Sequence, residues 1–434
     1  MMFKLLMKRF KFLLQLSCTG IASILIASCS SPRHGIVPSQ TKQPSVRVLI
    51  TEKQSRAVVG IQAPALVYLT GSLPMMALES AEIEMTVQQN GTILCTVHGT
   101  SKTFSSEIIK IACEDEQNTC IYNGKKYSDT LIFSTDGKTI SALNVLKLEK
   151  YLQGVVGNEI GTDRKEADFE AIKAQAILAR TYALLKLEAP MVHQFDLYDD
   201  TRDQVFTGSE LIPAMIWRAV YQTNGVVLMF GNHLAETYYH STCGGATEAP
   251  QLVWNRPQGK SFLNGVHDDE SGVVNCKISP SYRWREEYTR SEMENIVKKY
   301  LPSANPDYEQ IQFAPDAYLL DLRITKRMPS GRIAELQILM GNPGGKKIYT
   351  VFGDRVRWVL RRTDGSSILR SDLFDLDISR DSNNWITKIT IRGGGSGHGV
   401  GMCQWGAIGL SRKGRSTKNI LQKYFPGTEL KKIY

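Results

Sequence analysis

The feature that most limits how this chain can fold is a glycine-rich stretch near its C-terminus. Six of the nine residues from Gly393 to Gly401 are glycine, and His398 stands among them. Glycine reaches backbone conformations that other residues avoid, and it leaves no side chain between the backbone and a ligand. The stretch therefore predicts a loop whose backbone lies against a ligand or packs tightly between elements. It is not a phosphate-binding loop, because no Gly-Lys-Ser/Thr follows it.

The N-terminus has the layout of an export signal. Residues 1–11 are basic and residues 12–28 are apolar, so residues 1–28 are expected to be a signal peptide. Cleavage is expected before Cys29, because Ile26-Ala27-Ser28-Cys29 resembles the bacterial lipobox, whose cysteine receives a lipid. The alternative is an uncleaved membrane anchor. Serines follow Cys29, which favours sorting to the outer membrane in an envelope with two membranes, and residues 29–45 read as a flexible tether.

Export and charge together limit the class of partner. The net charge is +9, and four of the basic residues fall in the first 28, so a mature chain has a smaller surplus. Such a surplus fits an anionic envelope polymer or a membrane surface as well as nucleic acid. In an exported chain we expect the envelope partners and no nucleic acid.

After export, six further cysteines would lie in an oxidising compartment, where disulfides can form. They are Cys95, Cys113, Cys120, Cys243, Cys276 and Cys403. Cys113 and Cys120 bracket a polar loop and can form a short disulfide, and Cys95 can instead pair with either of them.

The order of predicted elements favours an α+β fold, and 434 residues suffice for two or three domains. Residues 46–140 predict a β-rich N-terminal region, with two-residue hairpin signals at Asn90-Gly91, Asn123-Gly124 and Asp136-Gly137. Residues 141–434 predict a mixed α/β region. Its expected helices cover residues 165–188, 209–222, 291–301 and 416–424, and its expected strands cover 224–240, 315–340 and 384–392. A capping-box match at Ser291 to Glu294 opens the third helix.

Six motifs in the second region carry a resemblance to a known family. They are Leu148–Glu159, Glu170–Ala183, Asp199–Gln204, Tyr239–Gly245, Gly397–Ala407 and Asn419–Leu430. Together and in this order they closely resemble the SpoIID family, the stage II sporulation protein D domain that also occurs in amidase-modifier proteins. The resemblance covers about 140–434 and leaves residues 46–140 unmatched.

The resemblance implies a peptidoglycan lytic transglycosylase with Glu159 as its essential glutamate. Such an enzyme cuts the β-1,4 bond between MurNAc and GlcNAc, preferably in strands stripped of stem peptides. One carboxyl group can protonate the leaving oxygen and then act as base while the sugar's 6-hydroxyl closes the ring. Neighbouring apolar residues are expected to raise the pKa of Glu159. Many relatives have proline two residues after this glutamate, whereas this chain has Gly161, so its loop is expected to be more mobile.

Five further residues are candidates for sugar contact. Lys173 and Arg180 are seven residues apart, so they project from the same side of their helix. Without the resemblance both would be taken for solvated surface charges, and with it they become expected cleft residues. Tyr182, His398 and Gln404 are weaker candidates.

A metal site is a further hypothesis. His240, Cys243 and Cys276 have side chains that suit a structural zinc ion, with His267, His398 or Cys403 as a fourth ligand. The rival is a disulfide between Cys243 and Cys276. No cofactor is expected to be required for the chemistry.

The expected function is therefore septal wall remodelling, in division or sporulation, by an exported and lipid-anchored protein on the periplasmic side of the envelope. Its expected partners are glycan strands, an amidase that acts before it, and the membrane that holds its lipid. The alternatives are a non-catalytic amidase modifier and a glycan-binding septal scaffold.

Overall fold

A computed structural model describes residues 42–434, except 72, 114–118, 190–193, 210–211, 257–259, 305–307 and 366. The expected signal peptide 1–28, the expected lipidation site Cys29 and most of the expected tether 29–45 lie outside the described residues. Within the described residues, no helix has the length and apolar character needed to cross a membrane.

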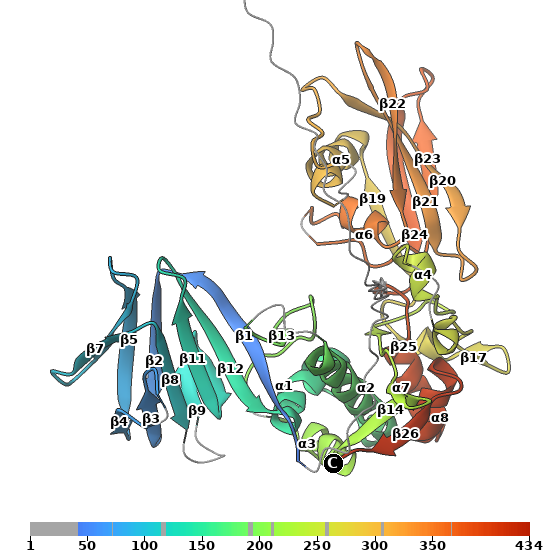
Figure 1. The fold of residues 1–434 in the computed structure, drawn as a ribbon. Helices are drawn as coiled ribbons and strands as arrows, with labels where there is room; N and C mark the ends of the chain where they lie inside the picture. The colour runs from blue at the N-terminus through green and yellow to red at the C-terminus, as the bar shows by residue number, and fades with distance from the viewer. Residues whose placement is uncertain are drawn as a thin grey trace, which may run out of the picture. The chain divides into compact units, whose positions relative to one another are not determined.

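The N-terminal region consists of two sheets, which are antiparallel except where β13 pairs with β1 in parallel (Figure 1). One has the order β13-β1-β12-β11-β8-β3-β4 and the other the order β10-β9-β2-β5-β6-β7. Alternate residues along the strands are buried, as in β2, where Ala57, Val59 and Ile61 point into the core. The strands are β1 (Ser45–Gln54), β2 (Arg56–Ile61), β3 (Ala65–Tyr68), β4 (Met76–Leu78), β5 (Ala81–Val87), β6 (Ile93–Val97), β7 (Thr103–Ser106), β8 (Ile108–Cys113), β9 (Thr119–Tyr122), β10 (Lys125–Ser128), β11 (Thr130–Thr135), β12 (Ile140–Lys147) and β13 (Leu197–Tyr198).

Only one of the three hairpin signals makes a two-residue turn. Asn123 and Gly124, with φ of 49° and 74°, join β9 directly to β10. Asn90-Gly91 and Asp136-Gly137 lie within longer loops, because β5 ends at Val87 and β11 ends at Thr135.

The second region is built around helix α2, which contacts α1, α3, α7, α8 and β14. Two strand pairings bring the C-terminal end of the chain into this region: β14 pairs with β26, and β16 runs parallel to β25. Its elements are α1 (Leu148–Ile160), η1 (Glu166–Asp168), α2 (Phe169–Glu188), α3 (Ala214–Gln222), β14 (Val226–Phe230), β15 (His233–Leu234), β16 (Tyr239–His240), α4 (Pro250–Val253), η2 (Ser261–Leu263), β17 (Asp269–Glu270), β18 (Val273–Val274), η3 (Asn275–Ile278), β25 (Met402–Cys403), α7 (Gln404–Arg412), α8 (Thr417–Tyr424) and β26 (Glu429–Lys432).

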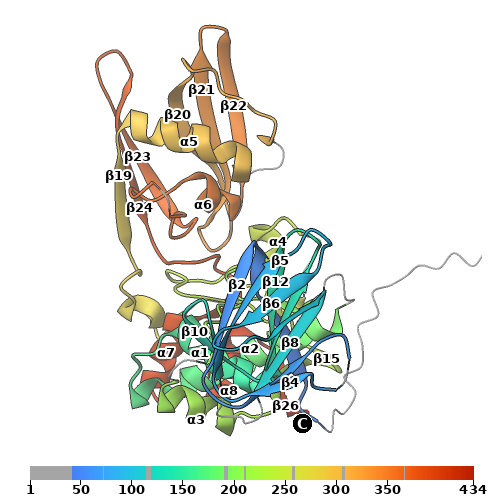
Figure 2. The same cartoon turned by 90° about the vertical axis from the view of Figure 1, so that its left-hand side faces the viewer.

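Between η3 and β25 the chain forms a part with its own hydrophobic core. Leu319, Leu336, Ile338, Val351 and Ile389 are fully buried there, in a cluster separate from the one around α2. We call residues 284–393 the insert. Its elements are β19 (Trp284–Tyr288), α5 (Arg290–Ala304), β20 (Tyr318–Arg327), β21 (Ile333–Asn342), β22 (Gly345–Phe352), α6 (Arg355–Val359), β23 (Phe374–Arg380) and β24 (Ile386–Gly393). Helix α5 contacts β19, β20 and β24 (Figure 2).

The helix boundaries follow the capping chemistry. Helix α8 begins after Ser416, whose hydroxyl accepts the N–H of Asn419, as the pattern over 416–424 predicts. The capping box of α5 is two residues earlier than predicted, because Thr289 and Glu292 exchange the reciprocal hydrogen bonds. The helix expected over 209–222 begins only at Ala214.

Candidate active site around Glu159

Glu159 lies in the last turn of α1 and is held by a backbone donor. Its Oε1 accepts the N–H of Val205 at 2.9 Å. The side chain is half-buried. Gly161 ends the helix with φ of 98°, a conformation closed to proline, and its N–H donates to the carbonyl of Gly157. The Gly161 in place of proline therefore matches the way α1 ends in this chain.

The segment that carries Val205 packs against α1 at Gly154. A Cβ on Gly154 would lie 2.5 Å from the carbonyl oxygen of Gly208 and 2.7 Å from the ring of Phe206. Asn158 adds two hydrogen bonds, to the carbonyl of Gly154 at 2.6 Å and to Thr207 Oγ1 at 2.9 Å. The loop packs directly on the helix because position 154 has no side chain.

The surroundings favour the protonated form of Glu159. Burial raises the pKa of this carboxyl group above its ordinary value, and the hydrogen bond from Val205 opposes the rise only in part. A carboxylate in the last turn of a helix also faces the negative end of the helix dipole. A carboxyl group that keeps its proton nearer neutral pH can act as a general acid.

Three buried or partly buried tyrosines, Tyr151, Tyr182 and Tyr239, lie near enough to Glu159 to feel its charge. Tyr151 donates to Gln204 Oε1 at 3.1 Å, and Gln204 Nε2 donates to the hydroxyl of Tyr239 at 2.9 Å. Burial raises the pKa of both Tyr151 and Tyr239 well above the ordinary value, with Glu159 among the charges that add to the rise. These hydroxyls therefore remain neutral beside the carboxyl group.

Tyr182 belongs to the same cluster. Its hydroxyl donates to Asp203 Oδ1 at 2.7 Å, and its pKa is raised by burial, with Glu159 again contributing. Asp203 also pairs with Lys186 at 2.7 Å and accepts the N–H of Tyr198. Of the predicted site residues, the structure thus brings Glu159 and Tyr182 together.

Sequence reasoning assigned no role to four residues of this cluster: Tyr151, Asp203, Gln204 and Tyr239. Each of them stands inside one of the motifs that carry the family resemblance. Their place in these motifs was the signal in the sequence that could have identified them as site residues. Their mutual hydrogen bonds join segments far apart in the chain, and no local pattern reports such contacts.

The prediction of a sugar-binding Arg180 is wrong. The side chain is fully buried, and it forms two 2.7 Å hydrogen bonds to the carboxylate of Glu149. Further bonds reach the carbonyl groups of Val220 and Val226. Its seven-residue spacing from Lys173 does not place the two in one cleft, because α2 is surrounded by other elements and buries this side of the helix.

Lys173 lies on the same helix but outside the buried contacts of Arg180. Its Nζ lies 2.5 Å from Glu170 Oε1 and over the ring of Phe169. Glu170 in turn accepts the N–H and the hydroxyl of Thr417, the first residue of α8. The expected sugar contact of Lys173 stays a prediction.

The other two candidates lie beside the glycine-rich stretch. His398 is half-buried, burial lowers its pKa to about 4, and its Nδ1 accepts the N–H of Val400. Its ring lies 5.1 Å from that of Trp254. Gln404 is buried and donates to Gln175 Oε1 at 3.3 Å.

Three cysteines and an aspartate form a buried cluster. The ligand atoms of Cys243, Asp268, Cys276 and Cys403 all lie within 4.8 Å of one another. Backbone N–H groups point at the sulfurs: that of Cys243 donates to Cys403 Sγ at 3.1 Å, and that of Gly406 donates to the same sulfur at 3.3 Å. Three thiolates and one carboxylate are a donor set that suits tetrahedral Zn²⁺. The residues present therefore fit a structural zinc ion.

The structure corrects the predicted ligand set in one position. His240 is not part of the cluster, and its Nδ1 is hydrogen-bonded to the carbonyl of Val400 at 3.0 Å. Asp268 takes its place, held by the hydroxyl of Tyr424 at 2.6 Å. Cys403 is the one of the three proposed fourth ligands that belongs to the cluster.

No disulfide joins the six described cysteines in this structure. Cys113 and Cys120 lie with their sulfurs 3.3 Å apart, which brings together the pair expected from the sequence. Cys243 and Cys276 lie 3.5 Å apart within the four-residue cluster.

Two family models match the chain. The model described as Stage II sporulation protein (SpoIID) matches residues 136–230, which include Glu159 and the tyrosine cluster up to Gln204. A model described as Domain of unknown function (DUF8618) matches residues 248–401, which include the insert.

Curated relatives agree with the first match. An uncharacterized protein of Brachyspira hyodysenteriae is 28% identical over 73% of this chain and 75% of its own. The amidase enhancer of Bacillus subtilis is 27% identical over 64% of this chain and 40% of its own, and stage II sporulation protein D of the same organism is 26% identical over 66% and 74%. These matches agree with the motifs around Glu159: the chain is similar to the SpoIID family, whose model covers residues 136–230.

Proposed function

We propose that this protein acts on the bacterial cell wall as a lytic transglycosylase, cutting the MurNAc–GlcNAc β-1,4 bond of peptidoglycan glycan strands. Glu159 is the general acid in the first step and the general base in the second. The observation that carries the proposal is the carboxyl group of Glu159, which accepts the Val205 N–H near neutral tyrosines and whose pKa is raised by burial.

The chemistry needs one such carboxyl group. Protonation of the leaving oxygen requires a carboxylic acid at the pH of the envelope, and a raised pKa supplies it. The carboxylate then accepts the proton of the sugar's 6-hydroxyl as the anhydro ring closes. The neutral hydroxyl of Tyr239 can hydrogen-bond a sugar oxygen without adding charge beside the forming oxocarbenium ion.

The names of the relatives support a role in the cell wall. Two are called stage II sporulation protein D and one amidase enhancer. We propose that strands stripped of stem peptides are the preferred substrate, so that the protein acts after an amidase in septal remodelling during division or sporulation.

The test uses a soluble form, residues 45–434, with intact and amidase-treated peptidoglycan. We expect wild-type protein to release products with 1,6-anhydro ends, read by mass spectrometry, and Glu159→Gln to lower the rate by about 10³-fold or more, since it removes the proposed acid and base together. Reducing ends would contradict the transglycosylase mechanism. A hydrolase generally needs a second carboxylate. Asp199, whose pKa is also raised by burial, would then be the first candidate to test.

A matched control is Glu188→Gln. Glu188 is also a glutamate at the end of a helix with a pKa raised by burial, but it has no place in the tyrosine cluster. We expect this variant to keep wild-type activity. An equal loss in both variants would mean that charge in general, and not Glu159, is responsible.

The amidase enhancer among the relatives favours one second candidate, a protein that stimulates an amidase without cutting glycan. An assay of stem-peptide release by an amidase, with and without this protein, distinguishes the two. Stimulation that survives Glu159→Gln, with no anhydro product from wild type, would support the second function.

We also propose that the buried cluster of Cys243, Asp268, Cys276 and Cys403 holds a structural zinc ion. Elemental analysis of the purified protein should give one zinc per chain, and Cys403→Ser should lower that content and the melting temperature. Cys95→Ser is the control, because Cys95 is equally buried but lies in a strand of the N-terminal sheets. Wild-type protein without zinc, or with a Cys243–Cys276 disulfide, would contradict the proposal.

Export and lipid anchoring at Cys29 complete the proposal, with the outer membrane favoured where the envelope has two membranes. Labelled fatty acid should enter the full-length chain, and Cys29→Ala should abolish the labelling and release the protein from the membrane fraction. Unchanged labelling of Cys29→Ala would contradict it.

A further inference from the structure

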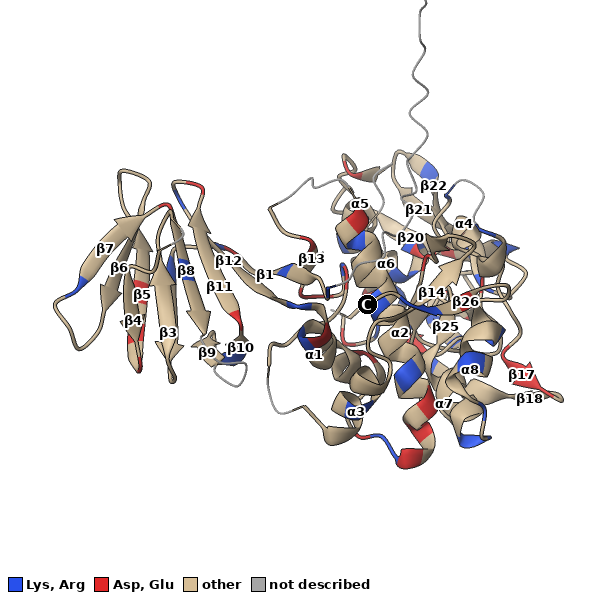
Figure 3. Cartoon of the chain, turned by 60° about the horizontal axis from the view of Figure 1, so that its bottom comes forward, with Lys and Arg blue, Asp and Glu red and all other residues tan. Residues whose placement is uncertain are grey.

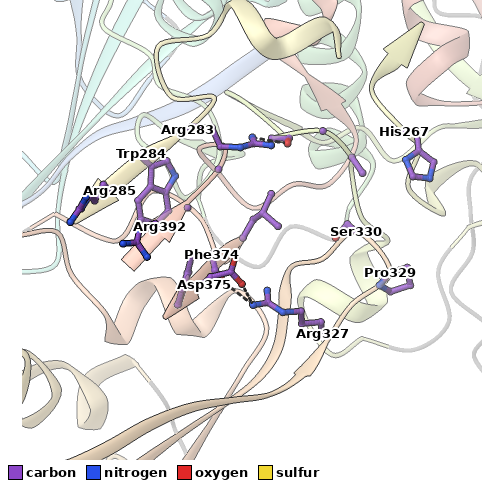
Figure 4. A pocket seen from close by; sticks show the side chains of 16 residues that line it. His267, Arg283, Trp284, Arg285, Arg327, Pro329, Ser330, Phe374, Asp375 and Arg392 are labelled. Atoms are coloured by element: carbon purple, nitrogen blue, oxygen red, sulfur yellow. Dashed lines mark hydrogen bonds and ion pairs between the residues drawn. The ribbon is translucent and has the colours of Figure 1, made fainter. Parts of the chain in front are cut away.

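A large cavity lies at the edge of the insert. Its volume is about 930 Å³, and its wall is formed by residues 244–246, 283–285, 373–375 and 392–394, together with His267, Arg327, Pro329 and Ser330 (Figure 4). Glu159 and the tyrosines around it are not among the lining residues. The cavity is therefore a site distinct from the proposed catalytic one, and its volume lies in the upper part of the usual range for ligand sites.

The charge of the cavity wall is strongly positive. Four arginines line it, Arg283, Arg285, Arg327 and Arg392, against the single carboxylate of Asp375 (Figure 4). Basic and acidic residues lie side by side on α5, where Lys298 pairs with Glu294 (Figure 3). At the cavity, Arg327 pairs with Asp375, so the other three arginines outnumber the carboxylates of the wall. The arginines are gathered at the cavity.

Strand register places two of these charges directly opposite one another. Arg285 on β19 is the cross-strand partner of Arg392 on β24. Like charges in this position lower the stability of a sheet. Their acidic partners, Glu287 and Asp377, are exposed side chains. Exposed ion pairs contribute about 0–1 kcal/mol each, so an anion entering the cavity can compete with them.

Arg283 is held in place by acceptors that carry no net charge. Its Nη1 donates to the carbonyl groups of Gly244 at 3.0 Å and Tyr282 at 2.7 Å, and its guanidinium stacks on the Tyr282 ring at 3.9 Å. These contacts fix the side chain and leave its positive charge available. A fixed guanidinium presents paired N–H groups that match the two oxygens of a carboxylate.

Glycines keep the backbone wall of the cavity open. A Cβ on Gly245 would meet no atom within 4 Å, so the space before it is free. Gly393 is required for a different reason: its Cβ would overlap the ring of Trp284. That ring lines the cavity and donates from Nε1 to the carbonyl of Gly395 at 2.8 Å.

We infer that this arginine-lined cavity binds carboxylate groups of the peptidoglycan strand, at a site separate from the one that contains Glu159. The choice of polymer rests on the proposed function. Fixed guanidinium groups select carboxylates by paired hydrogen bonds, and the rigid wall of Trp284 and glycine backbone leaves room for the sugar that bears them. The carboxylates can be those of stem peptides or the lactyl groups that an amidase uncovers.

Binding is measured with the Glu159→Gln protein, so that the strands stay intact. Arg285→Gln with Arg392→Gln removes the facing pair of charges. The matched control is Arg323→Gln with Arg56→Gln, which also removes two exposed arginines paired with carboxylates but none from the cavity. Cosedimentation with purified peptidoglycan should show an affinity loss of about tenfold or more for the first pair, and under twofold for the control.

Three forms of peptidoglycan identify the recognised group. Amidation of the carboxyl groups with a carbodiimide should lower binding as much as the arginine substitutions do, and should leave those substitutions without further effect. Intact strands and amidase-treated strands tell stem-peptide carboxylates from lactyl ones. Unchanged binding after amidation, dependence on phosphate polymers that remain on the wall, or equal losses in the cavity and control variants would each overturn the inference.

This outcome is independent of the catalytic test. If wild-type protein cuts no glycan but the cavity variants lose binding to carboxylate-bearing strands, the inference stands and the proposed function fails. If Glu159-dependent cutting is found and the cavity variants bind as the control does, the reverse holds.

Discussion

The protonation of Glu159 is set by its immediate neighbours. Burial and the negative end of α1 disfavour the carboxylate, and one backbone N–H, that of Val205, partly compensates. The same residue type elsewhere on this helix behaves differently: Glu149 is buried but paired with Arg180. Glu159 has no basic partner among its described contacts, and this suits the role of acid catalyst that we propose for it.

The raised pKa gives two pH effects of known sign. Cleavage should fall as pH rises through the pKa of Glu159, with the midpoint above the ordinary value of 4.5. The folded chain binds this proton more tightly than the unfolded chain, so the contribution to stability is complete below the unfolded pKa and is lost as pH rises through the folded pKa. Glu159→Gln should therefore melt at a higher temperature than wild type at pH 7, but not at pH 4. A lower melting temperature at pH 7 would contradict the raised pKa.

Arg180 and Lys173 provide a test of burial on one helix. Arg180→Met should lower the free energy of unfolding by about 3–5 kcal/mol, because Glu149 loses its partner inside the protein. Lys173→Met should cost less than about 1 kcal/mol, since its ion pair with Glu170 is only half-buried. Urea unfolding measures both. Arg180→Met with wild-type stability would mean that the guanidinium has another role.

At the scale of elements, the site depends on how closely a loop approaches a helix. The Val205–Gly208 segment can approach Glu159 because Gly154 has no side chain between its helix and the carbonyl oxygen of Gly208. The motif Leu148–Glu159 thus contains both the catalytic candidate and the glycine that lets its hydrogen-bond partner approach.

Gly154→Ala should lower activity by about tenfold or more, because its Cβ displaces the loop and with it the Val205 N–H. Gly157→Ala is the control on the same helix. Its Cβ would meet the Thr162 side chain at 3.2 Å, which can rotate away, and alanine favours the helix. Rates of anhydro-product release compare the two, and equal rates in both variants would show that the loop position does not matter.

At the scale of the whole molecule, the described chain has two main hydrophobic cores. The larger joins the N-terminal sheets to the helices around α2, and the other belongs to the insert. Unfolding of a chain with two cores need not be a single transition.

Leu336→Ala should therefore loosen the insert alone. Removal of this fully buried side chain costs about 2–5 kcal/mol, and amide exchange should quicken in β20, β21 and β24 while α2 keeps its protection. Ile172→Ala, in the other core, should give the reverse pattern. Faster exchange throughout the chain in both variants would indicate a single cooperative unit.

Local patterns predicted much of this architecture. The β-rich N-terminal region, the helix ending at Glu188 and the helix capped by Ser416 follow from periodicity and capping, which involve neighbours a few residues apart. The insert's separate core was not predicted, since its strands look alike whether they join one core or two. Two capping patterns overlap at the start of α5, Thr289–Glu292 and Ser291–Glu294. The structure uses the first, which the sequence alone did not distinguish from the second.

By itself, the sequence determined the α+β class, the resemblance to the SpoIID family and the choice of Glu159 as the residue to test, because motifs and periodicity are properties of the chain in order. Only the tertiary structure decided the rest. It buried Arg180 against Glu149, replaced His240 by Asp268 in the cysteine cluster, and gathered four arginines around one cavity. Contacts between residues far apart in the sequence depend on packing and burial, and these exist only once the chain has folded.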